Sequence, residues 1–123
     1  MNYLEEIKED LKLLEDKKDK LEYIISLGKE LKPFPSNLMS KENIVQSCNS
    51  PTFITKKPLL GHSESLIVKG YIAIILNAFE QEKPEELDQK LKEFVKETEL
   101  NVSLVSTRAN AFMNIYEYLK EKN

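Results

Sequence analysis

The apolar positions of the first 32 residues follow two helical stripes. Steps of three and four residues separate Leu4, Ile7, Leu11 and Leu14, which places them on one face of a helix. A second stripe consists of Leu21, Ile24, Ile25 and Leu31. Asp19 is a suitable N-cap for this second helix, which we expect to end near Lys32, before Pro33 and Pro35. Residues 33–42 then predict a surface connection.

The periodicity changes within residues 43–60. Two short β-prone runs, residues 44–45 and 52–55, predict two antiparallel strands. A third short strand could involve Leu59 and Leu60, but Pro58 disfavours it, because proline cannot donate a backbone hydrogen bond.

The second half of the chain predicts three more helices. Residues 64–82, with Ser63 as N-cap, are apolar on nearly every side and predict a central, buried helix. Pro84 suits the first turn of the next helix, and Ser106 suits the cap of the last one. Ion pairs four residues apart are expected between Glu86 and Lys90 and between Asp88 and Lys92. The inner faces are expected to be Leu87, Leu91, Phe94 and Val95, then Phe112, Ile115, Tyr116 and Leu119.

Helices that flank one small sheet predict an α+β fold, with an antiparallel sheet of two or three strands packed against several helices. We expect residues 1–123 to form a single domain. The formal charge of −3 and the pI near 5.3 argue against nucleic acid as a partner. The longest stretch without a charged residue, residues 43–55, is shorter than a membrane span, and the acidic N-terminus does not resemble a signal peptide. These features predict a cytoplasmic protein without a membrane partner.

Composition also limits the chemistry. The chain has one cysteine and one histidine, which excludes an internal disulfide and a zinc site built from thiolates and imidazoles. Its three glycines fit no phosphate-binding loop. From these two observations together we expect no metal and no cofactor. Cys48 is the candidate reactive group, because it lies between the predicted strands among small polar residues: Gln46, Ser47, Asn49 and Ser50. Residues 41–79 carry four lysines and two acidic residues, and positive surroundings favour the thiolate. The alternative is an inert packing cysteine.

The run KENIVQSCNSPTFI resembles the cysteine motif of the SufE family of sulfur acceptors. The matching residues are Asn43, Val45, Gln46, Cys48 and Ser50. Three further segments are similar to family motifs in the same order: LEYIISLGKEL, GHSESLIVKGYIAIIL and STRANAF. The resemblance therefore covers nearly the whole chain and implies a SufE/NifU-like fold.

The resemblance implies that Cys48 accepts sulfur from the persulfide of a SufS-type pyridoxal-phosphate cysteine desulfurase and relays it to an iron–sulfur cluster scaffold. The protein is then a carrier and activator of the desulfurase rather than an independent enzyme. The residues are consistent with this role, because thiolate attack on a persulfide needs one accessible cysteine and no resolving thiol.

Several positions depart from the family pattern. Ser47 replaces a glycine and Asn49 a glutamine beside the cysteine, while His62 and Glu64 replace two aspartates. The first two differences bear on the backbone conformation around the cysteine, and the last two on the choice of partner. Lys69 either raises the potential near the thiol or extends its charged end to solvent from a buried stem.

Other readings of the candidate residues stay open. Arg108 matches the family's Ser-Arg segment, where it would contact the desulfurase or stabilise the thiolate; the alternative is an ordinary surface charge. His62 as a base beside Cys48 would suit a stand-alone thiol enzyme, either peroxide-reducing or a Cys–His hydrolase. A third hypothesis is an interaction module in which Cys48 is incidental.

Overall fold

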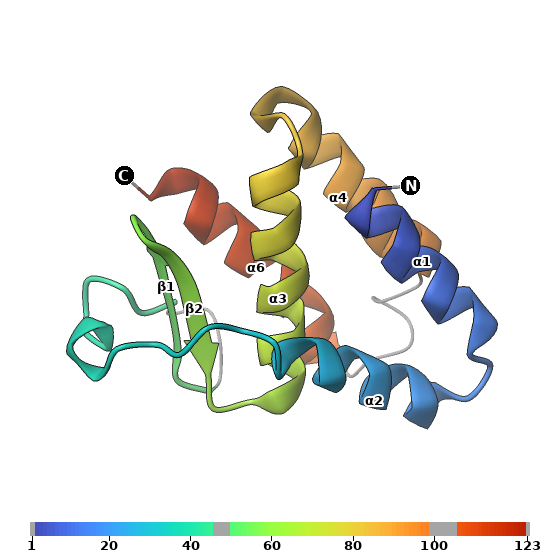
Figure 1. Ribbon diagram of the computed structural model, residues 1–123, viewed down its shortest axis with the longest axis horizontal. Helices are drawn as coiled ribbons and strands as arrows, with labels where there is room; N and C mark the ends of the chain where they lie inside the picture. Colours follow the sequence, from blue (N-terminus) through green and yellow to red (C-terminus); the bar gives the residue numbers. More distant parts are fainter. Residues whose placement is uncertain (1, 46–49, 99–105, 123) are drawn as a thin grey trace.

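Helix α3 (Leu66–Gln81) lies at the centre of the protein, and other elements surround it (Figure 1). The computed structural model describes residues 2–45, 50–98 and 106–122, with only the backbone of residues 106–111. The other α-helices among these residues are α1 (Tyr3–Leu13), α2 (Lys17–Gly28), α4 (Pro84–Thr98) and α6 (Ser106–Glu121). A short 3-10 helix, η1 (Ser36–Leu38), lies in the predicted surface connection. Ten of the sixteen residues of α3 are buried, which confirms the predicted central helix.

The predicted boundaries of α2 are wrong at both ends. The N-cap is Asp16, whose side chain accepts a hydrogen bond of 2.8 Å from the Lys18 N–H. Asp19 lies inside the first turn instead, where an acidic side chain also interacts favourably with the helix dipole. The helix ends at Gly28, and the chain continues in turns rather than as helix to Lys32.

The sheet is an antiparallel pair, β1 (Thr52–Lys56) and β2 (Leu59–Ser63), in which Thr52 pairs with Ser63. The prediction of an α+β fold is confirmed, but the assignment of the strands is corrected. Residues 44–45 contribute only an isolated bridge, between Ile44 and Phe53, whereas the disfavoured segment at residues 59–60 begins a full strand. Pro58 does not prevent this, because it lies in the turn, outside the ladder of hydrogen bonds.

Helix α3 begins later than predicted. Its N-cap is Ser65, whose hydroxyl accepts from the Val68 N–H, and not Ser63. Ser63 is the last residue of β2, so the turn from strand to helix occupies only residues 64 and 65. This short connection brings the end of β2 directly to the N-terminus of α3.

The C-terminal helices largely follow the prediction. Pro84 is the first residue of α4, and the ion pair between Asp88 and Lys92 forms at 2.9 Å. Lys90 pairs with Glu82, just after the end of α3, and not with Glu86. Ser106 is the first residue of α6 rather than its cap. All eight predicted inner residues of these helices are buried. Among the described residues, no helix is both long and apolar enough to cross a membrane.

Asp88 joins α4 to α6 and should make stability depend on pH. Its carboxylate contacts Lys92 at 2.9 Å and Lys120 at 3.2 Å, and these lysines lower the pKa of Asp88. A carboxyl group whose pKa is lower in the folded than in the unfolded state stabilises the fold at pH values above its unfolded-state pKa. This contribution is lost as the pH falls through the folded-state pKa. We expect Asp88→Asn to be less stable than the wild type near neutral pH, with a difference that shrinks below about pH 4. Urea unfolding at several pH values measures this, and a difference that does not change with pH would contradict it.

Candidate functional site

The candidate site lies where the segment before β1 pairs with that strand. The Val45 N–H donates to the Thr52 carbonyl oxygen at 2.8 Å, and the Ile54 N–H donates to the Asn43 carbonyl oxygen at 2.9 Å. Val45 is also buried. Residues 46–51 therefore connect two positions that are hydrogen-bonded to each other. We call residues 46–49 the cysteine segment, and the described residues on either side of it, Val45 and Ser50, its two ends.

Four predicted site residues belong to this segment and lie outside the described residues: Gln46, Ser47, Cys48 and Asn49. Their neighbours on both sides, Val45 and Ser50, are described. The local geometry of the site is therefore the geometry of these two ends and of the residues that hold them.

The downstream end of the cysteine segment is held by buried hydroxyl groups. Thr52 Oγ1 donates to the Ser50 carbonyl oxygen at 2.9 Å and lies 2.9 Å from Ser63 Oγ. Ser63 Oγ in turn accepts from the Ser65 N–H at 3.1 Å. We call these four groups the hydroxyl chain: the Ser65 N–H, Ser63 Oγ, Thr52 Oγ1 and the Ser50 carbonyl. The side chains at its centre are buried, with Thr52 0% and Ser63 1% exposed.

A backbone hydrogen bond reinforces the same end. The Glu64 N–H donates to the Pro51 carbonyl oxygen at 3.1 Å. Glu64, a predicted site residue, therefore lies beside the exit of the cysteine segment, and its side chain is exposed. Ser50 is half-buried there.

His62 is placed on the other face of β2. Successive strand residues point to opposite faces, and Ser63 points inward. His62 pairs with Phe53 across the sheet, and its ring lies 6.2 Å from that of Phe34 between centroids. The predicted pairing of His62 with Cys48 lies outside the described residues, because Cys48 does.

Lys69 and Arg108 come from two different helices. Lys69 is a half-buried residue of the first turns of α3, and its Cβ lies beside Gly28 of α2, so its stem is part of the contact between the two helices. Arg108 is the third residue of α6, and its side chain lies outside the described residues. Of the described site residues, Glu64 lies closest in the structure to Ser50, through its backbone hydrogen bond to the adjacent Pro51.

Two of the four lysines counted in the sequence lie at the far end of the hairpin from Thr52. Lys56 and Lys57 lie at the turn, and Lys56 donates to the Lys122 carbonyl oxygen and lies over the Phe79 ring. A strand rises by about 3.4 Å per residue, which puts Lys56 about 14 Å from Thr52, more than a Debye length at physiological ionic strength. Lys56 therefore contributes little to the electrostatic potential at Thr52.

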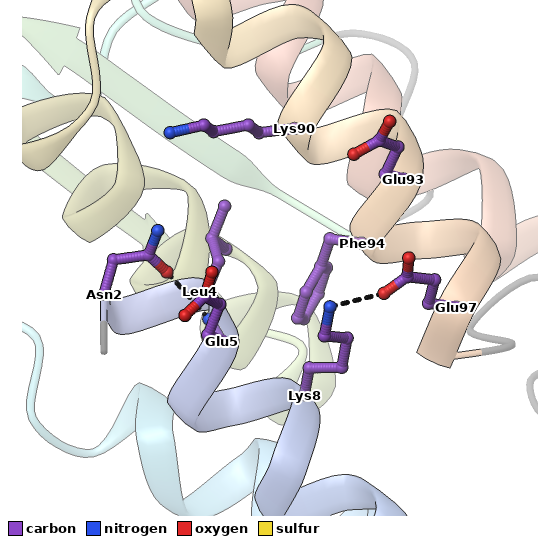
Figure 2. Close-up of a pocket in the computed structure, with 8 residues that line it drawn as sticks. All are labelled: Asn2, Leu4, Glu5, Lys8, Lys90, Glu93, Phe94 and Glu97. Carbon is purple, nitrogen blue, oxygen red and sulfur yellow. Dashed lines mark hydrogen bonds and ion pairs between the residues drawn. The ribbon is translucent and has the colours of Figure 1, made fainter.

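Two cavities lie away from this end of the hairpin. One, of about 150 Å³, lies between α1 and α4, on the other side of α3 from the sheet, and Leu4 and Phe94 form its apolar part (Figures 1 and 2). The Lys8 ammonium forms an ion pair with Glu97 at its edge (Figure 2). The other, of about 160 Å³, lies between the end of α2, β2 and α3. Neither is lined by a predicted site residue.

Thr52 and Ser63 are the residues that the sequence analysis missed. Thr52 was assigned to a strand and Ser63 to a helix cap, without a role at the site. A signal was present, since Thr52 alternates with the apolar Ile54 and so falls on the inward face of a strand. A hydroxyl group buried there requires a hydrogen-bond partner.

The fold and the site define a class of protein. It is an α+β protein whose single cysteine lies in the sequence between two residues, Val45 and Ser50, that are both hydrogen-bonded to Thr52. The model of the SufE family, described as an Fe-S metabolism associated domain, matches residues 5–123. The chain therefore belongs to the SufE family, as its motifs predicted.

Relatives from several bacteria are similar over most of the chain. The cysteine desulfuration protein SufE of Wigglesworthia glossinidia brevipalpis is 34% identical over 115 residues, which are 87% of this chain and 80% of that protein. An uncharacterized SufE-like protein of Synechocystis sp. is 32% identical over 87% of this chain and 71% of its own length. Another, from Rhizobium meliloti, is 29% identical over 99% of this chain and 95% of its own.

Proposed function

We propose that this protein is a sulfur acceptor whose Cys48 takes sulfur from the persulfide of a SufS-type pyridoxal-phosphate cysteine desulfurase. The sulfur then passes to a scaffold on which iron–sulfur clusters are assembled. One observation carries the proposal: the family match spans residues 5–123, and the only cysteine of the chain occupies the cysteine position of the family motif.

The proposed transfer balances without an added oxidant or reductant. The Cys48 thiolate attacks the outer sulfur of the donor persulfide and forms a new sulfur–sulfur bond. The sulfur–sulfur bond of the donor breaks, and the donor cysteine leaves as a thiolate. A second thiolate on the scaffold repeats the exchange and returns Cys48 to its starting state. Because the chain has no other cysteine, an internal disulfide cannot compete with this delivery.

The described residues support this role through the ends of the cysteine segment. Cys48 is three residues from Val45 and two residues from Ser50 in the chain. Both of these neighbours are hydrogen-bonded to Thr52, through the Val45 N–H and the Ser50 carbonyl. A group-transfer reaction gains from such restraint, because its rate depends strongly on the geometry of the attacking atom.

Mass spectrometry of the intact protein tests the proposal. After incubation with a SufS-type desulfurase and free cysteine, we expect the protein to gain the mass of one sulfur atom. Peptide mapping should place this atom on Cys48, and treatment with a reductant should remove it. A protein that stays unmodified while the desulfurase turns over would contradict the proposal.

A further inference from the structure

The directions of the hydrogen bonds in the hydroxyl chain follow from counting protons. A carbonyl oxygen can only accept, so the single proton of Thr52 Oγ1 is donated to the Ser50 carbonyl. Thr52 Oγ1 therefore accepts in its contact with Ser63, and the Ser63 hydroxyl is the donor. Ser63 Oγ itself accepts from the Ser65 N–H. Every donor points the same way, from the start of α3 toward the end of the cysteine segment.

This arrangement strengthens the hydrogen bond from the Thr52 hydroxyl to the Ser50 carbonyl. Hydrogen bonds that run in one direction polarise one another, and burial at low dielectric strengthens each of them. Thr52 and Ser63 are almost completely buried, so water does not replace a bond that is lost. Helix α3 packs in the core along most of its length. The side chains of Ser63 and Thr52 therefore connect the N-terminus of this helix to the Ser50 carbonyl by hydrogen bonds.

Thr52 holds both ends of the cysteine segment at once. Its backbone carbonyl accepts from the Val45 N–H at 2.8 Å, and its hydroxyl donates to the Ser50 carbonyl at 2.9 Å. We infer that Thr52 and Ser63 are positioning residues for sulfur transfer, which hold the two ends of the cysteine segment at a set separation. This inference rests on the proposed function, and it assigns a role in that reaction to residues that do not exchange sulfur themselves.

The decisive variant is Thr52→Val, which keeps the shape of the side chain and removes its hydroxyl. We expect its sulfur-loading rate at saturating desulfurase to fall about tenfold or more, since small displacements of a reacting group cost up to about 100-fold. The half-saturating concentration of desulfurase should change much less, because the side chains of Thr52 and Ser63 are buried and not accessible to a partner. Thr52→Ser retains the hydroxyl and should load at close to the wild-type rate.

Thr55→Val is the matched control. Thr55 lies in the same strand, is also buried, and its hydroxyl donates to the Pro58 carbonyl at 2.6 Å at the opposite end of the hairpin. Its removal should affect stability in a similar way and leave the loading rate unchanged. Rates are compared at a temperature where urea unfolding shows each variant to be folded.

The outcomes separate the inference from the proposed function. Equal loading rates for Thr52→Val and Thr55→Val would overturn the inference, and so would a Thr52→Ser variant as slow as Thr52→Val. If Thr52→Val does not fold, Ser63→Ala is judged by the same rate comparison, because it removes the donor to Thr52. Wild-type protein that takes up no sulfur overturns the proposed function instead.

Discussion

Replacing Cys48 by serine is expected to abolish the transfer of sulfur to this protein. The reaction needs a thiolate that can form a sulfur–sulfur bond, and serine has neither the sulfur atom nor a comparable acidity. The chain has no other cysteine to substitute for Cys48, so the loss should be complete rather than partial. Intact mass measured after incubation with desulfurase and cysteine checks this, with circular dichroism to show that the variant is folded.

The same variant, together with Cys48→Ala, separates the proposed function from its alternatives. Sulfur uptake by Cys48→Ser would contradict the proposal. Stimulation of the desulfurase that Cys48→Ala leaves unchanged would favour an interaction module. Peroxide reduction or ester hydrolysis by the wild type without any partner, lost in Cys48→Ser and slowed in His62→Ala, would favour a stand-alone thiol enzyme.

Replacing Gly70 by alanine is expected to lower the free energy of unfolding more than Asp88→Asn or Glu80→Ala does. Gly70 lies in the second turn of α3, where the helix packs against α2. A Cβ atom there would overlap the Ile24 carbonyl oxygen and lie 2.5 Å from Ile24 Cγ2 and 2.8 Å from the Ile24 carbonyl carbon. The obstacle includes the backbone of a helix, which cannot rotate away as a flexible side chain can. The two helices must therefore separate, at a cost of about 3 kcal/mol or more.

This prediction opposes the one from helix propensity. Alanine is favoured over glycine inside a helix by about 1 kcal/mol, so the local preference alone predicts that the variant is stabilised. Urea unfolding measures which effect dominates, and a midpoint equal to or above that of the wild type would contradict the overlap. Glu80→Ala serves as a control on the same helix, because Glu80 is exposed and its substitution should change the free energy of unfolding by less than about 0.5 kcal/mol.

The helices could be predicted because their signal is local. Apolar residues at helical spacing identified the elements that became α1, α2, α3, α4 and α6, and the all-apolar stretch became the central helix. Helix ends were less predictable, since several residues near each end can cap it. Asp16 and Ser65 are the caps, while Asp19 and Ser63, which have equally suitable side chains, are not.

The strands and the site depended on contacts between distant residues. Residues 44–45 are β-branched and residues 59–60 are two leucines, so local composition favoured the first pair as a strand. Only the antiparallel pairing of β1 with β2 made the second pair part of a strand. Similarly, the motif around Cys48 indicated a candidate reactive residue, but the partners of Thr52 are eleven residues away at Ser63 and across the segment at Val45.

The sequence by itself determined the class of fold, the central helix, the family and the single thiol of the chain. These follow from spacing, composition and motif, which are properties of the chain alone. Only the tertiary structure decided which caps are used, which residues form the second strand, why Gly70 must be glycine, and that buried hydroxyl groups hold Ser50. Each of these depends on atoms that are distant or interchangeable in the sequence, and only packing selects which of them come within hydrogen-bonding or van der Waals distance.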